Sequence, residues 1–551
     1  MSAESRAVQD PDLDDGDSVA LPRRPFVVRA RSAADAVVSR ASDLRARLGD
    51  RSVFFGTFVV LFSGLLFRNR WVFSRHVTEF GDEALNSLLV RKALRFHLLV
   101  GNYSRVGFHH PGPAFMDNQA IGQGLFYDLL HLVPAPFNGQ LVAVMAMNCL
   151  MLAAVVRIVW RHTGSLACAL LAAVVPYTYL AFPTAGGDPI ASTWMPDQYL
   201  VPVLLLIFSA AAVSTGRLTE LPYLAFSCLY LWHGHVSFLL IATAIAATAV
   251  ALPAVRRVVS GSWSWSFERR PALIAAGWVL LFALPLVLNL ALHWPGEFGK
   301  YLHYSQSPQA GHHSLSQAVD YMASYWSTGS HPFLELPAVY LAALCSAITF
   351  PDTATRRFFT GAVVGGAMAS LMLVYYATNG IDDLSASYIG MWSMMVVPAL
   401  LLVIACRLWT LFRRPPSALP RVAILGAAVA ALFVAMTAPH LENLYTPGRS
   451  TPQAFKSLQA VAGGRTIMID VGADIGPDVP GIVLQAARQG DRACVTDPAM
   501  ALFLTSDYIC TGADRAHGTL FYASRRPQTQ EKDGPAVAIL GGTEFSLKPR
   551  S

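Results

Sequence analysis

The chain alternates long apolar stretches with short polar ones over most of its length. About 17–25 apolar residues are enough for a helix to cross the hydrocarbon core of a bilayer. With shorter stretches accepted at bends, the pattern predicts eleven spans, at about 52–67, 139–158, 165–182, 199–214, 221–232, 235–252, 272–293, 335–350, 358–378, 388–412 and 421–438. The first run starts well inside the chain and ends in Leu-Leu-Phe-Arg, which favours an uncleaved span over a signal peptide.

The distribution of basic residues orients these spans. Cytoplasmic loops are enriched in Lys and Arg, and every second loop here is basic, around Arg157 and Arg161, Arg217, Arg256 to Arg270, Arg356 and Arg357, and Arg413 to Arg421. The opposite short loops contain one basic residue, Lys300. This asymmetry requires the stretch 221–252, interrupted at His233-Gly234-His235, to cross twice. We therefore expect a multi-pass protein of the cell (plasma) membrane whose N-terminus is cytoplasmic and whose C-terminus is extracytoplasmic.

This topology divides the chain into three parts. Residues 1–51 form a mostly disordered cytoplasmic tail, 52–438 form the transmembrane domain, and 439–551 form an external tail. Long external loops are then expected at 69–138 and 294–334. In the tail, short apolar runs at 466–471, 493–495 and 536–540 alternate with Gly, Asp and Pro, which favours a small α/β domain.

Composition supports a membrane protein and excludes other classes. Hydrophobic residues make up 54% and charged residues 14% of the chain, against about 25% charged in soluble domains. Mean hydropathy is +0.43. These values exclude a soluble multidomain enzyme, a disordered protein and a fibrous repeat. The net charge of +6 comes without a basic stripe that carries interleaved aromatic residues, so a nucleic-acid partner is not expected.

Cysteine placement adds one prediction about the external tail. Five of the seven cysteines fall in apolar runs and are typical of small core residues. Cys494 and Cys510 lie 16 positions apart in the polar tail, on the expected oxidising side, and we predict a disulfide between them. Two unpaired thiols are the alternative. The expected fold is therefore mainly α, a polytopic transmembrane helical bundle with a small C-terminal extracytoplasmic α/β domain.

The first external loop contains the densest polar signal. It opens with Phe-Gly-Asp-Glu-Ala-Leu-Asn at 80–86, which includes Asp82 and Glu83. Leucines at helical spacing follow, as expected of an amphipathic helix in the membrane interface. The segment 99–113 then combines backbone-bending glycines and prolines with Arg105, His109 and His110.

These residue types together fit one chemistry. A carboxylate can take a proton from a hydroxyl group, and Arg and His can neutralise phosphate oxygens, with Arg offering a bidentate fork. At a membrane surface this suits transfer of a sugar from a lipid-linked phosphosugar. The acid activates the acceptor, and the cations stabilise the departing lipid phosphate.

At these residues the chain resembles the GT-C superfamily of polytopic glycosyltransferases, and its actinobacterial members most closely. The resemblance covers about 52–440. It rests on the acidic pair after the first span and on a set of short motifs, which are the YSRxGxxHPGP-like stretch from Tyr103 to Pro113, Trp194-Met195-Pro196, His233-Gly234-His235-Val236-Ser237 and the end of a span at Pro285–Asn289. The chain departs from the expected pattern at Asp117-Asn118, where an aromatic or aliphatic pair is expected.

The resemblance implies an inverting transfer from a polyprenyl-phosphate sugar to a cell-envelope glycan or glycolipid acceptor, outside the cytoplasm. Carried over by position, Asp82 is the base and Glu83 its neighbour. Our physical argument adds Arg105, His109 and His110 as donor-phosphate ligands. Because non-helical backbone at membrane depth is tolerated where it lines a cavity, His233, His235 and Trp194 are expected to line one.

Each of these residues also has a purely structural interpretation. Asp82 and Glu83 could cap the helix that follows, where acids favour the positive dipole end. His109 and His110 could pack in a Pro/Gly turn, and Arg105 could pair with an acid or with lipid headgroups. The histidines at 233 and 235 could simply be polar residues at a helix break.

Two other functions compete with the glycosyltransferase. A transporter or flippase usually places ionisable residues within its spans, whereas the charges here lie at span ends. A non-catalytic membrane protein of envelope assembly is the other alternative. A divalent cation (Mg, Mn or Ca) stays open, because one acidic pair offers few hard oxygen ligands and a third would have to come from another external loop acid, such as Asp188, Asp197, Asp382 or Asp383.

Overall fold

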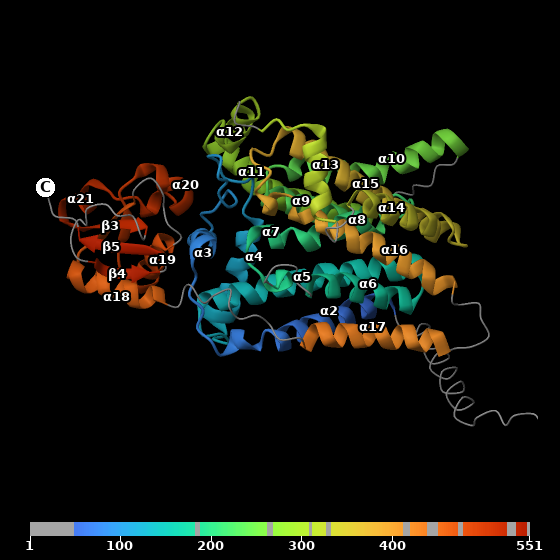
Figure 1. Ribbon diagram of the computed structural model, residues 1–551, viewed down its shortest axis with the longest axis horizontal. Coiled ribbons are helices and arrows are strands. Elements are labelled where there is room, and N and C mark those ends of the chain that lie inside the picture. Colours follow the sequence, from blue (N-terminus) through green and yellow to red (C-terminus); the bar gives the residue numbers. More distant parts are fainter. Residues whose placement is uncertain are drawn as a thin grey trace, which may run out of the picture.

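The computed structural model has two parts, a long helical bundle and a small α/β domain at one end of it (Figure 1). We call that end of the bundle the domain end. The structure describes residues 49–181, 188–261, 268–307, 311–326, 332–411, 419–437, 450–471, 478–525, 536–540 and 542–547. The predicted cytoplasmic tail therefore lies outside the described residues up to position 48, and the first of the described helices begins at Asp50.

Each of the eleven predicted spans coincides with a helix of the bundle. These helices are α2 (Asp50–Arg68), α5 (Pro136–Thr163), α6 (Leu166–Ala181), α8 (Leu200–Val213), α9 (Leu221–Gly234), α10 (Phe238–Ser260), α11 (Arg269–Leu292), α14 (Pro332–Ile348), α15 (Thr353–Asn379), α16 (Val396–Leu411) and α17 (Leu419–Thr437). Within the described residues, seven helical segments are long and apolar enough to cross a membrane by themselves. The protein is thus a polytopic membrane protein with the expected helical-bundle fold.

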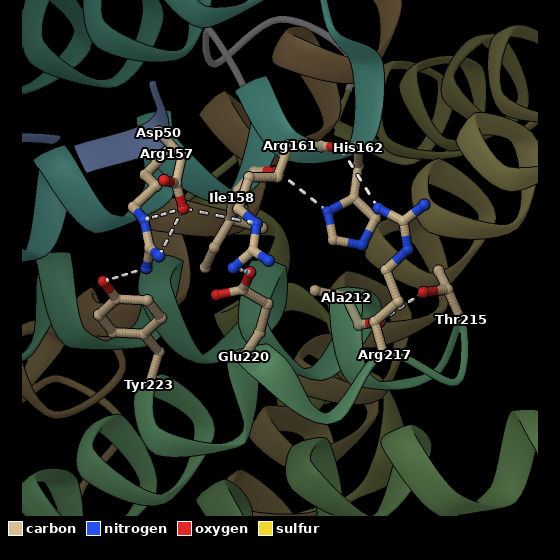
Figure 2. A network of polar contacts seen from close by, with 10 residues as sticks. All are labelled: Asp50, Arg157, Ile158, Arg161, His162, Ala212, Thr215, Arg217, Glu220 and Tyr223. Carbon is tan, nitrogen blue, oxygen red and sulfur yellow. Dashed lines mark hydrogen bonds and ion pairs between the residues drawn. The ribbon is translucent and has the colours of Figure 1, made fainter. Parts of the chain in front are cut away.

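Polar contacts tie the helices together around the start of α2 (Figure 2), which lies at the end of the bundle remote from the domain (Figure 1). Arg157 of α5 lies between Asp50, 2.7 Å away at the start of α2, and the Tyr223 hydroxyl of α9, also 2.7 Å away. Arg161 reaches the fully buried Glu220 at 2.7 Å. A buried carboxylate needs such a partner, because desolvation of an unpaired charge is costly. The basic loop residues at this end therefore also serve as structural ties between spans.

The C-terminal domain is built on one five-stranded mixed sheet. Its strand order is β2-β1-β3-β5-β4, in which β1 (Ile467–Val471) pairs in parallel with β2 (Ala493–Val495) and β3 (Thr519–Arg525). The hairpin of β4 (Ala536–Leu540) and β5 (Thr543–Leu547) completes it in antiparallel sense. Helices α18 (Thr451–Ala462) and α19 (Val479–Gln489) contribute to its core. The three apolar runs singled out in the sequence are β1, β2 and β4.

A disulfide joins the same two cysteines that the sequence pairs. Cys494 lies in β2, and the Cys510 backbone N–H donates to the Val495 carbonyl at 2.9 Å. This contact brings the two Cα atoms to 5.0 Å, within the range that a disulfide spans. The bond therefore fastens the segment after β2 to the edge of the sheet.

The amphipathic segment of the first loop is α3 (Gly81–Ala93), and its surroundings differ from the expected membrane interface. Leu85 and Leu88 are buried in the core of the C-terminal domain, while Leu89 packs into the core of the bundle. Phe96 lies beyond the helix and is 94% exposed. Helix α3 is thus a protein-covered joint between the two parts of the molecule (Figure 1).

Candidate active site

A cavity of about 740 Å³ lies at the domain end of the bundle. Its walls come from the start of α3, the loop over 102–110, α7 (Met195–Gln198), the first turns of α10, α12 (Gly296–Ser305) and the loop after α15. Segments far apart in the sequence therefore meet here. Of the residues singled out from the sequence, the cavity brings together Asp82, Arg105, His110, Trp194 and His235.

The Asp82 carboxylate is held by two donors from separate segments. Asp82 lies in the first turn of α3, after Gly81, whose φ of 55° is a left-handed conformation that suits glycine. The Tyr103 hydroxyl donates to Oδ1 at 2.5 Å, and the Trp194 indole N–H donates to Oδ2 at 3.2 Å. These two aromatic donors orient the carboxylate, which also lies in the first turn of α3, where the helix dipole favours an acid. An ionised carboxylate has about four acceptor sites, which leaves room for a further donor.

Arg105 supplies positive charge to the same cavity. Its Nη2 lies 2.5 Å from Oδ1 of Asp382, and 37% of the arginine side chain is exposed. Partly exposed ion pairs contribute about 0–1 kcal/mol, so a phosphate could displace this one at small cost. A guanidinium has five N–H donors, and Asp382 engages only some of them. The sequence showed Asp382 as one of several external loop acids, without indicating that it faces Arg105.

His110 and His235 pack against each other in the cavity wall. Their ring centroids are 4.1 Å apart, and the Val236 backbone N–H donates to Nδ1 of His110 at 3.3 Å. Burial lowers the pKa of His110 well below its usual range, and the neighbouring His235 and His109 lower it further. The His110 ring is therefore uncharged near neutral pH. It can offer an Nε2–H to a ligand, but the positive charge at this site comes from Arg105.

Three of the residues expected at the site lie away from the cavity. Glu83 does not line it, and burial raises the pKa of Glu83 to about 7, with a smaller contribution from Asp82. His109 faces a second cavity of about 910 Å³, where its backbone N–H donates to Glu297 at 2.8 Å. His233 is a buried structural residue, because its Nδ1 accepts the Ala114 backbone N–H at 3.3 Å and its Nε2 lies 2.8 Å from the Phe282 carbonyl oxygen.

The cavity becomes apolar away from Asp82 and Arg105. Leu239, Leu240 and Ile241 from the start of α10 line it together with Leu302 of α12. Leu240 is 52% exposed and Leu302 is 65% exposed, so this wall reaches the outer surface of the bundle. One cavity therefore joins a carboxylate and a guanidinium to an apolar surface at the outside of the bundle.

The described residues that line the cavity offer few ligands to a divalent cation. Asp82 and Asp382 are the acidic side chains among the described residues that line the cavity, and Asp382 pairs with Arg105. Over the described ranges, no group of three or more His, Cys, Asp and Glu side chains is arranged to hold a metal. Mg²⁺ in proteins usually keeps several waters and is held by one or two carboxylates together with substrate phosphates. Because the described residues form no preformed metal cluster, we derive no step through a metal.

The protein shares its fold with solved structures at low sequence identity. No family model matches the chain, and no curated protein matches it. The crystal structure of ArnT from Cupriavidus metallidurans in the apo state superposes with a TM-score of 0.55 at 10% identity, covering 89% of this chain and 97% of that one. The structure of the same protein bound to undecaprenyl phosphate gives a TM-score of 0.53 at 11% identity, with the same coverage. The chain is therefore a polytopic membrane protein that shares the overall fold of the ArnT structures.

Proposed function

We propose that this protein is an inverting membrane glycosyltransferase that transfers a sugar from a polyprenyl-phosphate donor to a cell-envelope glycan or lipid acceptor. The observation that carries the proposal is the single cavity that unites Asp82 and Arg105 with an apolar wall reaching the outside of the bundle. A polyprenyl-phosphate sugar is an amphiphile whose polar sugar phosphate and apolar chain match the polar and apolar parts of this cavity. Its isoprenoid chain would lie along Leu239, Leu240 and Leu302, and its phosphate would lie near Arg105.

The proposed chemistry assigns one task to each polar group. Asp82 accepts the proton of an acceptor hydroxyl while that oxygen attacks the anomeric carbon of the donor sugar. The bond from that carbon to the phosphate oxygen breaks, and the lipid phosphate leaves with the electron pair. Arg105 stabilises the negative charge that develops on the leaving phosphate. Tyr103 and Trp194 hold the carboxylate in place, and the uncharged His110 can donate one hydrogen bond.

The proposed orientation places the cavity on the external side. The basic residues Arg157, Arg161 and Arg217 gather at the end of the bundle remote from the domain, as expected of a cytoplasmic end. The disulfide of the C-terminal domain is typical of an oxidising compartment. The ArnT structure with bound undecaprenyl phosphate supports a polyprenyl phosphate as the ligand class for this fold.

The test uses the full chain purified into nanodiscs. Wild-type protein would receive a panel of polyprenyl-phosphate-linked hexoses and pentoses with envelope glycan acceptors, and release of polyprenyl phosphate would be measured. We expect Asp82→Asn to lower kcat by about 10²–10⁴-fold, as general-base catalysis contributes. Asp128→Asn is the matched control, because Asp128 is an exposed carboxylate of the same loop that does not line the cavity. Full activity in Asp82→Asn would refute the role of Asp82.

A binding measurement tests the donor end of the cavity separately. Undecaprenyl phosphate would be titrated into wild-type protein and into Arg105→Ala, and binding would be followed by native mass spectrometry. A charge-assisted hydrogen bond contributes about 1.5–3 kcal/mol, so affinity should fall by about 10–100-fold. Equal affinity for both proteins would remove Arg105 from the phosphate site.

A further inference from the structure

Helix α3 carries Asp82 at its start and is buried on two faces. Ala84, Leu85 and Leu88 belong to the hydrophobic core of the C-terminal domain, with Phe455 and Ile482 among its members. The other face of α3 packs into the core of the bundle. The helix that presents the proposed base is therefore shared by both parts of the molecule, so displacement of the domain would displace the helix.

Polar contacts with the domain hold the same helix at both ends. Before its start, the fully buried Glu79 forms an ion pair with Arg488 of α19. Near its end, the Arg91 Nη2–H donates to the Ala487 carbonyl at 2.9 Å. Lys92 lies 3.2 Å from a carboxylate oxygen of Asp507. These contacts restrict rotation and sliding of α3 against the domain.

One connection from the domain to the Asp82 carboxylate runs through two aromatic rings. Phe503, in the short helix α20 (Ala501–Leu504), meets the Tyr103 ring edge to face, with centroids 4.9 Å apart and an interplanar angle of 67°. Tyr103 in turn donates its hydroxyl to Asp82. Phe503 does not line the cavity, so it acts on a bound substrate through other residues, of which Tyr103 is the one that it meets ring to ring.

We propose that the C-terminal domain is a positioning element for the proposed catalytic base, and that Phe503 is its positioning residue, acting through Tyr103. The inference rests on the proposed function, because it takes Asp82 as the base. A misplacement of about 1 Å at a reacting group can cost 10²-fold in rate. A domain none of whose described residues lines the cavity can therefore control the rate by fixing one hydroxyl beside one carboxylate.

A double-mutant cycle on kcat tests this connection. We expect Phe503→Ala and Tyr103→Phe each to lower kcat by about tenfold, with the donor KM unchanged for Phe503→Ala. Because both substitutions act through one hydrogen bond, the kcat of the double variant should lie within about twofold of the kcat of the less active single variant. Multiplicative losses in the double variant, or a loss confined to KM, would overturn the proposal. Phe503→Leu keeps apolar bulk for folding and should give an intermediate kcat.

A second measurement does not depend on activity. Hydrogen exchange of the amides over 85–89 would be followed in full-length wild type, Phe503→Ala and the control Ile539→Ala, whose side chain is 45% exposed on β4. Exchange should quicken several-fold in Phe503→Ala alone. Unchanged exchange in Phe503→Ala would overturn the coupling between the domain and α3. This readout is independent of activity. Failure of the proposed function would show separately, as an absence of sugar transfer by wild type across the panel of sugars.

Discussion

Replacing Arg488 with alanine should loosen the joint between the C-terminal domain and α3. Arg488 forms two hydrogen bonds with the Glu79 carboxylate, whose side chain is fully buried, while 15% of the arginine side chain is exposed. Ser87 also donates to Glu79 at 2.8 Å and would remain. Removing one partner of a buried ion pair costs about 3–5 kcal/mol. The remaining serine bond and the partial exposure of Arg488 place the expected cost near 3 kcal/mol.

The assay is hydrogen exchange of α19 and α3 amides in the full chain. This local measurement is preferable to global melting, because a membrane protein of two parts need not unfold in one step. A cost of about 3 kcal/mol corresponds to exchange about 10²-fold faster, at about 1.4 kcal/mol per tenfold change. Amides of α5 and α8, in the bundle core, provide the internal control.

The matched variant is the double substitution Glu79→Gln with Arg488→Met. It removes both charges while keeping side-chain volume, so the buried carboxylate is no longer left without its partner. Exchange in this variant should return to within about tenfold of wild type, since apolar replacements of buried pairs are often neutral. If Arg488→Ala exchanges as slowly as wild type, the ion pair contributes nothing to the joint and the reasoning is refuted.

Three further predictions concern the site and its surroundings. Glu83→Gln should keep kcat within about threefold of wild type, because Glu83 does not line the cavity and glutamine preserves its shape. The raised pKa of Glu83, about 7, means that the folded state binds more protons than the unfolded state between about pH 4.3 and 7. The proton bound to Glu83 stabilises the folded state fully at low pH, and this stabilisation is lost as pH rises through 7. The Tm of Glu83→Gln should therefore exceed that of wild type at pH 8 and equal it at pH 4. A Tm difference that does not change with pH would contradict this. Arg105→Lys should raise the donor KM by less than Arg105→Ala does, because lysine keeps the charge and loses the fork; equal kinetics for the two variants would exclude a role for the charge. Treatment with EDTA should leave sugar transfer unchanged, and activity restored by Mg²⁺, Mn²⁺ or Ca²⁺ after chelation would show that the site recruits a metal.

The fold was largely predictable because membrane spans are long apolar runs whose signal is local in sequence. All eleven predicted stretches are helices, including the pair divided at His235. In the C-terminal domain, strands β1, β2 and β4 were predictable as apolar runs, whereas β3 and β5 were not, because they mix polar and apolar residues. Helical spacing also showed that Leu85 and Leu88 form an apolar face. It could not show that a domain more than 360 residues later covers that face.

The sequence predicted which types of residue form the site, but it did not predict where their side chains point or which residues they contact. Asp82 and Arg105 line one cavity, as expected of residues brought together for one reaction. The sequence did not indicate that Asp382 is the ion-pair partner of Arg105. His109 and His110 look equivalent by position. Near the bridge between Tyr103 and His109 the backbone is extended, and successive side chains of an extended segment point to opposite sides. One histidine therefore faces the Asp82 cavity and the other faces a second cavity.

The pairing of Glu79 with Arg488 spans 409 positions of the chain, which has a consequence for biogenesis. During synthesis the first loop emerges long before the residues that complete its packing, and contacts so distant in sequence form late. Helix α3 can be seated only after α19, which carries Arg488, has been synthesised. A chain that stops before α19 would lack a seated Asp82 carboxylate, so on the proposed function the order of synthesis itself would keep such incomplete molecules from transferring sugar.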